Sequence, residues 1–270
     1  MRTPITYYGG KQRLAEMIIQ MIPKHRIYCE PFFGGGAVFF AKPKSYLEVI
    51  NDTNERLITF YKQVQDHFEE IHDMVQKSLH SESEYYRAKD IYFGKTEATE
   101  TEIAWSVWIM TNFSYSGSPV GGWKWCNGTA GSHSGVFMRR KRDEFTIALK
   151  NRLQDVQISC RDALNVIKQR DTENTFFYLD PPYPNCDQKH YSGYTIEKLE
   201  ELLMMLQDIK GKFILSNYNS TMLDSYIDVN GWNKIEIDMP LSVANLTRSK
   251  RKVEVLVSNI SRNNNNSLFG

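Results

Sequence analysis

The sequence predicts an α/β protein with a doubly wound, mainly parallel sheet and a helical insertion. Strand-like and helix-like segments alternate along both ends of the chain, and several strands are continuous hydrophobic runs rather than alternating patterns. Such runs are typical of strands that helices cover on both faces, as in a parallel sheet. The 270 residues, 41% of them hydrophobic, suffice for one large domain that carries an insertion.

The N-terminal elements alternate between helix and strand. The first helix is predicted by an apolar stripe with helical spacing, which Pro23 ends. The residues of this stripe are Leu14, Met17, Ile18, Met21 and Ile22. The next expected elements are a strand at 26–30, a helix from about residue 36, a strand at 46–52 and a helix from about Asn54. A glycine turn therefore joins the first strand to its helix.

The alternation returns after residue 142. Strands are expected at 156–162, 176–180, 212–217, near 234 and near 253, with a helix over the leucines at 199, 202, 203 and 206. Between about 56 and 142 two helical stripes replace the strands: Phe68, Ile71, Val75 and Leu79, then Ile103, Val107 and Trp108. The Gly-, Ser- and Trp-rich stretch 114–135 follows, so we expect a helical insertion that ends in a loop or hairpin. The polar residues 261–270 predict a loose tail.

The cysteine spacing, the apolar segments and the charge of the chain indicate which class of protein it belongs to. The four cysteines, at 29, 126, 160 and 186, lack the spacing of a metal or redox site, which fits reduced thiols in the cytoplasm. No apolar span has membrane length, and the first 25 residues lack the apolar core of a signal peptide. The net charge is only +1, but RRKR at 139–142 and RSKRK at 248–252 are dense basic clusters. Each reads either as a set of phosphate contacts or as ordinary solvated surface.

The glycine-rich turn EPFFGGGAVFF, at 30–40, leads from a strand into a helix. Glycines let a ligand approach the backbone, and the start of a helix offers free amides. The spacing is not that of a phosphate-binding loop, and Glu30 ahead of the turn suits a positively charged ligand. Asp52 ends the next strand about 20 residues later, where a carboxylate can accept both hydroxyls of a ribose. We predict a nucleotide-type site; the alternative is a helix-capping acid.

A second acid stands where a hydrophobic strand stops, in FFYLDPPYPN at 176–185. Proline donates no backbone hydrogen bond and fixes its own φ, so Pro181 and Pro182 end the strand and stiffen the loop after Asp180. The Asp180 carboxylate and the Pro181 carbonyl are two acceptors suited to an exocyclic amine, while Tyr183 can stack on a ring. The alternative for Asp180 is an ordinary turn or N-cap acid.

Taken together, these segments resemble the Dam-type, alpha-class adenine-N6 DNA methyltransferases, which use S-adenosylmethionine. The resemblance spans nearly the whole chain and rests on six segments in the family's order: TYYGGKQRL at 6–14, EPFFGGGAVFF at 30–40, INDTNERLI at 50–58, LDPPY at 179–183, FILSNYNS at 213–220 and TRSKRKVEVLVSN at 247–259. It implies a Rossmann-like methyltransferase fold and adenine methylation by base flipping, in a cytoplasmic enzyme of a bacterium or phage-infected cell.

The resemblance also implies which residues form the site. The implied catalytic positions are Asp180, Pro181, Pro182 and Tyr183. The implied cofactor-binding positions are Tyr7, Lys11, Glu30, Pro31, Phe32, Gly34, Gly36, Asp52, Asp162 and Asp180. The residues alone favour a core aromatic for Tyr7 and a solvated cation at a helix start for Lys11, and Asp162 also reads as a helix N-cap.

By the same resemblance, residues 56–142 form the target-recognition region, and residues 1–55 with 143–260 form the catalytic domain. The segment NFSYSG at 112–117 resembles the start of the DNA-contacting hairpin, although GATC-reading members carry Asn and Arg there, so the recognition sequence stays open. The DNA contacts that we expect are Tyr115, Ser116, Lys124, Asn127, Arg139, Arg140, Lys141, Arg248 and Lys250, with the basic clusters on phosphates.

We expect direct methyl transfer to the N6 amine in double-stranded DNA, without a metal ion, and a cognate restriction endonuclease is a possible partner. Two other functions remain open, and a third fails on the sequence. An RNA nucleobase methyltransferase would hold its amine in the same way, and a silent relative would bind DNA without catalysis. A nicotinamide dehydrogenase would share the glycine turn and Asp52, but its glycine spacing differs and it leaves 180–183 without a role.

Overall fold

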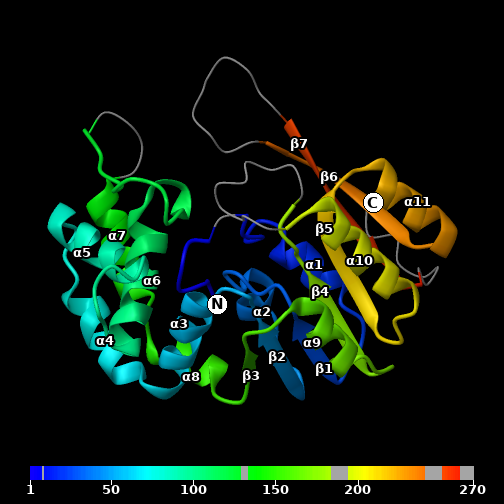
Figure 1. The fold of residues 1–270 in the computed structure, drawn as a ribbon, viewed down its shortest axis with the longest axis horizontal. Coiled ribbons are helices and arrows are strands. Elements are labelled where there is room, and N and C mark those ends of the chain that lie inside the picture. The colour runs from blue at the N-terminus through cyan, green and yellow to red at the C-terminus, as the bar shows by residue number, and fades with distance from the viewer. Residues whose placement is uncertain (8, 129–132, 184–193, 241–250, 262–270) are drawn as a thin grey trace. The chain divides into compact units, whose positions relative to one another are not determined.

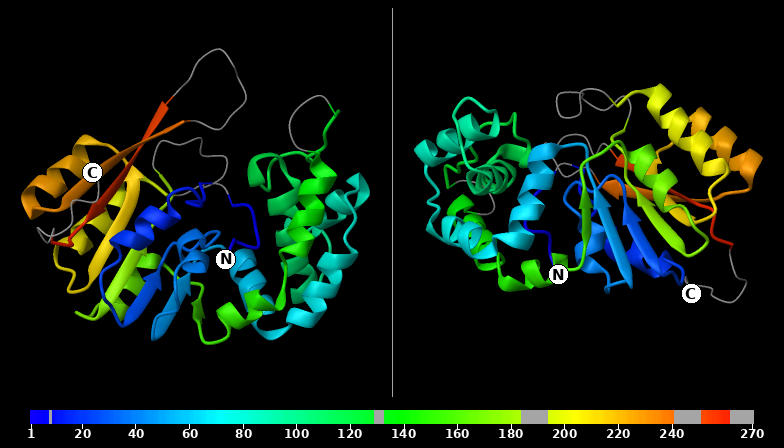
Figure 2. Two further views of the ribbon diagram at one scale, coloured as in Figure 1. Left: turned by 180° about the vertical axis from the view of Figure 1, so that it is seen from behind. Right: turned by 60° about the horizontal axis from the view of Figure 1, so that its bottom comes forward.

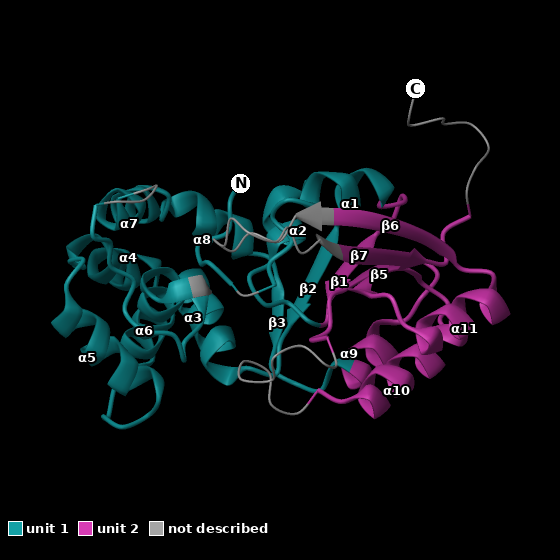
Figure 3. Ribbon diagram, turned by 90° about the horizontal axis from the view of Figure 1, so that it is seen from above, with its two compact units in different colours: residues 1–21, 32–163 teal, residues 22–31, 164–270 magenta. Residues whose placement is uncertain are grey.

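The computed structural model describes residues 1–7, 9–128, 133–183, 194–240 and 251–261 (Figure 1). The chain forms two compact units (Figure 3). Unit 1 comprises residues 1–21 and 32–163, and unit 2 comprises residues 22–31 and 164–270. Both units contribute strands and helices, so neither is purely helical.

The α/β part of unit 1 carries the glycine turn. Its elements are α1 (Ala15–Met21), α2 (Ala37–Ala41), β2 (Leu47–Asn51) and β3 (Gln157–Ser159). Strands β2 and β3 are parallel, with Asn51 opposite Ser159. The two strands therefore end together, and the segments that follow them, which begin with Asp52 and Cys160, start side by side.

The remaining elements of unit 1 form a helical cluster (Figures 1 and 2). They are α3 (Glu55–Asp66), α4 (Phe68–Lys77), α5 (Glu82–Tyr92), α6 (Glu100–Phe113), the short 3-10 helix η1 (Tyr115–Gly117), α7 (Ser134–Asp143) and α8 (Ile147–Leu153). Helix α6 is buried from Ala104 to Phe113 and packs against α3, α4 and α5. Its start is fixed by a capping box, in which Thr99 and Glu102 satisfy each other's backbone amides. Burial around α6, rather than helix propensity, thus holds the cluster together.

Unit 2 contains most of the sheet. Its elements are β1 (Ile27–Glu30), β4 (Thr175–Leu179), α10 (Ile196–Gln207), β5 (Lys212–Tyr218), α11 (Thr221–Asn230), β6 (Asn233–Pro240) and β7 (Arg251–Ser258), and helix α9 (Ala163–Arg170) leads into it. The strand order is β1-β4-β5-β7-β6. The first three strands are parallel, whereas β7 is antiparallel to both β5 and β6. Helices α10 and α11 pack against each other over these strands (Figure 2).

The predicted α/β class is confirmed: the strands pair mostly in parallel, with helices between them, as in a Rossmann-like fold. Strand β4 is buried at all five positions, which is the reason that its sequence is a continuous hydrophobic run. No described helix is both long and apolar enough to span a membrane. The two compact units are not the predicted functional domains, so the boundaries at 55 and 142 stay a prediction.

One part of the predicted helical stripe is wrong. Leu79 lies beyond the end of α4 and its side chain is 64% exposed. The reason lies in Ser78, whose hydroxyl accepts a hydrogen bond from Trp105 Nε1 at 2.7 Å and whose carbonyl accepts one from Arg142 at 2.7 Å. These contacts end the helix at Ser78, because its terminal groups are already satisfied from outside.

Candidate functional site

The glycine turn of unit 1 is shaped by two glycines with positive φ, Gly34 at 48° and Gly36 at 64°. A Cβ atom on Gly34 would lie 3.0 Å from Cδ1 of Tyr7, and one on Gly36 would lie 2.4 Å from Cζ of Phe33. Both positions therefore require glycine for their backbone conformation and for space. Tyr7, predicted to contact a cofactor, packs its ring against this turn.

Asp52 ties the end of β2 to the glycine turn. Its carboxylate accepts hydrogen bonds from the backbone amides of Gly34 and Asn54, each at 2.9 Å. Tyr61 makes a second hydrogen bond to the turn by donating to the Gly34 carbonyl at 2.9 Å. Burial raises the pKa of Asp52, and the amide hydrogen bonds oppose this rise. The carboxylate oxygens have further lone pairs, so Asp52 can hold the turn and still accept hydroxyl groups of a ligand.

Asn51, the residue before Asp52, connects the ends of β2 and β3. Its side-chain oxygen accepts hydrogen bonds from the Ser159 hydroxyl at 2.8 Å and the Arg161 amide at 2.9 Å, and its amide donates to the Arg161 carbonyl at 2.9 Å. The side chain is fully buried. Asp162 follows directly and is exposed at the start of α9. Asn51 thus fixes the backbone that presents Asp162, one of the predicted cofactor positions.

The other predicted cofactor positions are placed as follows. Lys11 is buried rather than solvated, and its ammonium donates to the Gly9 carbonyl at 3.1 Å. Glu30 is buried at the end of β1 and accepts a short hydrogen bond from the Tyr28 hydroxyl. Pro31 is buried and Phe32 is half-buried where the chain passes from unit 2 into unit 1.

The predicted catalytic tetrapeptide begins directly after β4 in unit 2. Pro181 is buried, while Asp180, Pro182 and Tyr183 are half-buried. The Tyr183 hydroxyl lies 3.2 Å from Oδ1 of Asp180 and makes a short hydrogen bond to Oε1 of Glu254, which is on β7. Acid and tyrosine are therefore brought together, as the sequence predicts, with a second acid that it did not predict.

Tyr183 remains a phenol in this setting. Burial raises its pKa well above the ordinary value, and the neighbouring Asp180 and Glu254 carboxylates raise it further. Its ring meets the ring of Tyr218 edge-on, with centroids 4.3 Å apart and planes inclined by 65°. The hydroxyl is thus a donor at neutral pH, and the ring position is constrained by contacts at both ends.

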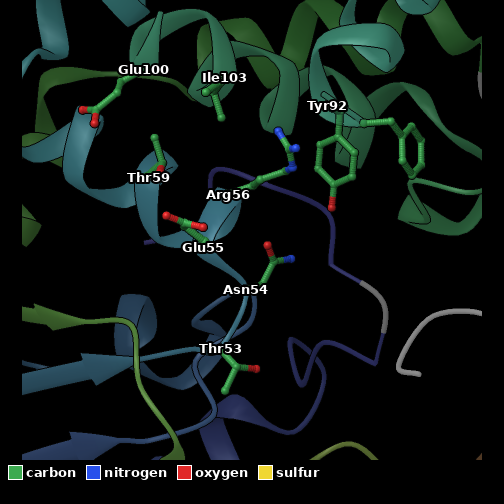
Figure 4. A pocket seen from close by; sticks show the side chains of 9 residues that line it. Thr53, Asn54, Glu55, Arg56, Thr59, Tyr92, Glu100 and Ile103 are labelled. Atoms are coloured by element: carbon green, nitrogen blue, oxygen red, sulfur yellow. The ribbon is translucent and has the colours of Figure 1, made fainter. Parts of the chain in front are cut away.

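A cavity of about 650 Å³ opens in unit 1 beside the start of α3 (Figure 4). It is lined by Thr53, Asn54, Glu55, Arg56, Thr59, Tyr92, Phe93, Glu100 and Ile103. The Tyr92 hydroxyl points toward Asn54 (Figure 4); burial raises the pKa of this phenol, and its hydrogen bond with Asn54 opposes the rise. None of the predicted site residues lines this cavity, so it supports no role for them.

The basic cluster at 139–142 lies on α7, a helix that its polar sequence did not predict. Arg139 and Arg140 are exposed. Lys141 is buried, and its ammonium donates to the Thr3 carbonyl at 3.3 Å and lies 3.9 Å from Glu144. The prediction that Lys141 contacts DNA is therefore wrong, because a buried ammonium cannot contact a phosphate without leaving its site.

The predicted hairpin begins with a bridge between Ser114 and Trp123. Tyr115 is 46% exposed and its hydroxyl donates to the Trp125 carbonyl at 2.9 Å. Asn127 is exposed, and the Lys124 ammonium lies 4.1 Å above the Phe137 ring. Ser116 belongs to η1 but its side chain is outside the description, as are residues 129–132, Arg248 and Lys250 entirely. The described contacts favour a shaped, partly apolar surface over a loose loop.

Two of the residues that sequence reasoning missed are Glu254 and Asn51. Each is a buried polar residue in a hydrophobic strand, VEVLVS and LEVIN. A buried polar side chain in such a run needs a hydrogen-bond partner, and this requirement is the signal that the sequence offers. The partners, Tyr183 and Arg161, are 71 and 110 positions away in the chain, which no local pattern reveals.

Residues 7–237 match the family model of the D12 class N6 adenine-specific DNA methyltransferases. A type II methyltransferase of Lactococcus lactis subsp. cremoris is 29% identical over 270 residues, which cover 93% of each chain. A type II methyltransferase of Methanocaldococcus jannaschii is 27% identical over 228 residues, 71% of this chain and 72% of that protein. The DNA N-6-adenine-methyltransferase of Escherichia phage P1 is 27% identical over 223 residues, 77% of this chain and 28% of that protein. The matched span includes the glycine turn, Asp52 and the tetrapeptide at 180–183.

Proposed function

Because this chain belongs to the D12 class N6 adenine-specific DNA methyltransferase family, we propose S-adenosylmethionine as its methyl donor and a flipped-out adenine of duplex DNA as its acceptor. The single observation that carries the proposal is the acid–tyrosine contact at the end of β4, where Tyr183 lies 3.2 Å from Asp180. That contact sets a carboxylate and an aromatic ring side by side, the two groups that an amine on a planar base requires.

The residues of unit 1 fit the proposed cofactor. Gly34 and Gly36 have positive φ and no space for a side chain, so they fix the shape of the turn beside which we place the methionine part of the cofactor. Asp52 is held in place by two amides and retains lone pairs for the two ribose hydroxyls. When bound, the cofactor supplies a methyl group on a positively charged sulfur.

The tetrapeptide would act on the amine of the target base. An amine conjugated to an aromatic ring is a poor nucleophile, because its lone pair is delocalised into the ring. The Asp180 carboxylate and the Pro181 carbonyl would accept its two N–H groups, which favours a tetrahedral nitrogen with a localised lone pair. Acceptors fixed beforehand at the end of a buried strand lower the barrier without reorganising during the reaction. Tyr183 would stack on the flipped adenine.

We further propose that residues 56–142 recognise the target sequence. Support comes from the exposed Arg139 and Arg140 on α7 and from the partly apolar surface around Tyr115 and Lys124. Cationic side chains would hold phosphates while the adenine leaves the stack. Since the relatives from Lactococcus and Methanocaldococcus are type II methyltransferases, a cognate endonuclease is the partner that we propose, in the cytoplasm of a microbial or phage-infected cell.

The test is to incubate the purified protein and S-adenosylmethionine with unmethylated genomic DNA and, separately, with total RNA. We expect N6-methyladenine at one short motif of the DNA, read by nucleoside mass spectrometry and single-molecule sequencing. Methylation of RNA alone would overturn the choice of substrate. Cofactor binding without modification of either nucleic acid would identify a silent DNA-binding relative. Thermal stabilisation by S-adenosylhomocysteine, but not by NAD, is the expected cofactor result.

A further inference from the structure

Tyr183 is held by two residues that face each other across a pair of strands. Tyr218 ends β5 and Glu254 lies on β7, and the two are direct partners in the antiparallel register. Tyr218 meets the Tyr183 ring edge-on, and Glu254 accepts the hydroxyl proton. Because directly opposed residues of an antiparallel pair stand close together on one face, the register of β5 and β7 sets both contacts at once.

Glu254 is an unusual residue to find at this point of the sheet. It is 5% exposed and lies between Val253 and Val255, at the start of the buried part of the strand. Burying a carboxylate is costly unless hydrogen bonds compensate. A leucine would fill the position without that cost, so stability alone does not account for an acid there. The short hydrogen bond from the Tyr183 hydroxyl is the contact that a leucine could not make.

The Tyr183 hydroxyl has two carboxylates within hydrogen-bond distance, those of Asp180 and Glu254. Asp180 lies within 3.2 Å of that hydroxyl, and one proton cannot serve two carboxylates equally. When the Tyr183 hydroxyl donates to Glu254, its single proton is directed away from the carboxylate of Asp180. The ring is fixed at the same time, since its far end is bound and its edge packs on Tyr218.

We propose that Glu254 is a positioning residue for methyl transfer. It binds the Tyr183 hydroxyl, fixes the ring on which the target adenine stacks, and keeps the proton of that hydroxyl away from Asp180. The inference rests on the proposed function, because it assigns Tyr183 the stacking role given above. Glu254 acts through Tyr183 and touches neither cofactor nor base.

The test is a double-mutant cycle with Tyr183→Phe, Glu254→Leu and the double variant, measured as single-turnover methylation of saturating DNA. Each single variant should react about tenfold more slowly or worse, since misplacement by about 1 Å can cost a factor of about 100. The double variant should be no slower than the slower single variant, because the Leu substitution has nothing left to remove once the hydroxyl is gone. Replacing both partners by apolar groups should also restore part of the thermal stability that either single change removes.

Two further variants distinguish the loss of Tyr183 positioning from a general loss of stability. Glu254→Gln keeps an oxygen that accepts from the hydroxyl, so it should stay within a few-fold of the wild-type rate. Tyr178→Phe removes another buried hydroxyl, which lies 3.0 Å from Ser216 Oγ, and should lower the melting temperature but not the rate. Equal loss from Glu254→Leu in the wild-type and Tyr183→Phe backgrounds would overturn the inference. A wild-type protein that methylates neither DNA nor RNA would overturn the proposed function, and this inference with it.

Discussion

Lys141→Met should stabilise the protein without affecting its interaction with DNA. Lys141 is 8% exposed, and its nearest polar partners are the Thr3 carbonyl at 3.3 Å and the Glu144 carboxylate at 3.9 Å. Burial lowers the pKa of this lysine from its usual 10.5 to about 8, with Glu144 opposing the change and Arg140 adding to it. Methionine has a similar length and no charge, so it fits the buried site while removing the group that destabilises it.

The size of the effect follows from the two pKa values. At about 1.4 kcal/mol for each pKa unit, the buried ammonium costs the folded state about 3 kcal/mol near pH 7. Losing the long hydrogen bond to the Thr3 carbonyl offsets about 1 kcal/mol of this. Lys141→Met should therefore raise the free energy of unfolding by about 2 kcal/mol at neutral pH.

The pH dependence has a definite sign. Between pH 8 and 10.5 the unfolded chain keeps the proton of Lys141 and the folded chain has lost it, so the stability of the wild type rises with pH through this window. At pH 9.5 the cost has fallen to about 1.4 kcal/mol, and the advantage of the methionine variant should nearly vanish.

Urea unfolding at pH 7.5 and 9.5 checks both the size and the trend. Lys150→Met is the matched control, because Lys150 pairs with Glu69 at the surface and should change stability by less than about 0.5 kcal/mol at either pH. A methionine variant that is less stable than the wild type at pH 7.5, or whose advantage grows with pH, would refute the reasoning.

Three other outcomes are expected. Asp180→Ala should abolish methylation while leaving the fold and DNA affinity nearly intact, because Tyr183 keeps its bond to Glu254; residual turnover near the wild-type rate would contradict the assigned role. Replacing Arg139 and Arg140 by Ala should lower the salt slope of DNA binding by about 2 in log–log titrations, whereas Lys141→Met should leave it unchanged. Asn51→Ala should cost about 1–3 kcal/mol of stability and weaken S-adenosylhomocysteine binding in calorimetry. An unchanged affinity in that destabilised variant would show that Asn51 has no part in shaping the cofactor site.

The elements that could be predicted from sequence are those whose pattern matches their burial. Strand β4 reads as a hydrophobic run because both of its faces are covered, and α3 begins where Asn54 caps it. Helix α7 escaped prediction because its sequence, SGVFMRRKRD, is mostly polar and has no apolar period. Its anchors are tertiary: Met138 and Lys141 are buried, and Arg142 binds the Ser78 carbonyl from another helix. Tertiary contacts of this kind produce no periodic pattern of apolar residues in the sequence.

The same distinction separates the predicted part of the site from the rest. Asp52 and Asp180 could be found because each ends a hydrophobic strand, where a charged residue is conspicuous and the chain emerges from the sheet. Lys11 and Lys141 could not be judged from sequence, since both read as solvated cations and both are buried. Whether a long side chain reaches water depends on what packs over it, and this is decided by residues far away in the sequence.

The antiparallel strand β7 supplies the proposed catalytic residues at the end of β4 with a contact from elsewhere in the sequence. Both neighbours of β4, the strands β1 and β5, are parallel to it and end at the same edge of the sheet. Strand β7 runs the other way, so its beginning, with Glu254, lies beside the end of β5. A buried residue of a strand, rather than a loop residue, thereby contacts the tyrosine of the tetrapeptide. If this geometry positions Tyr183, shifting the β5–β7 register should impair catalysis even though every residue of the LDPPY segment is retained.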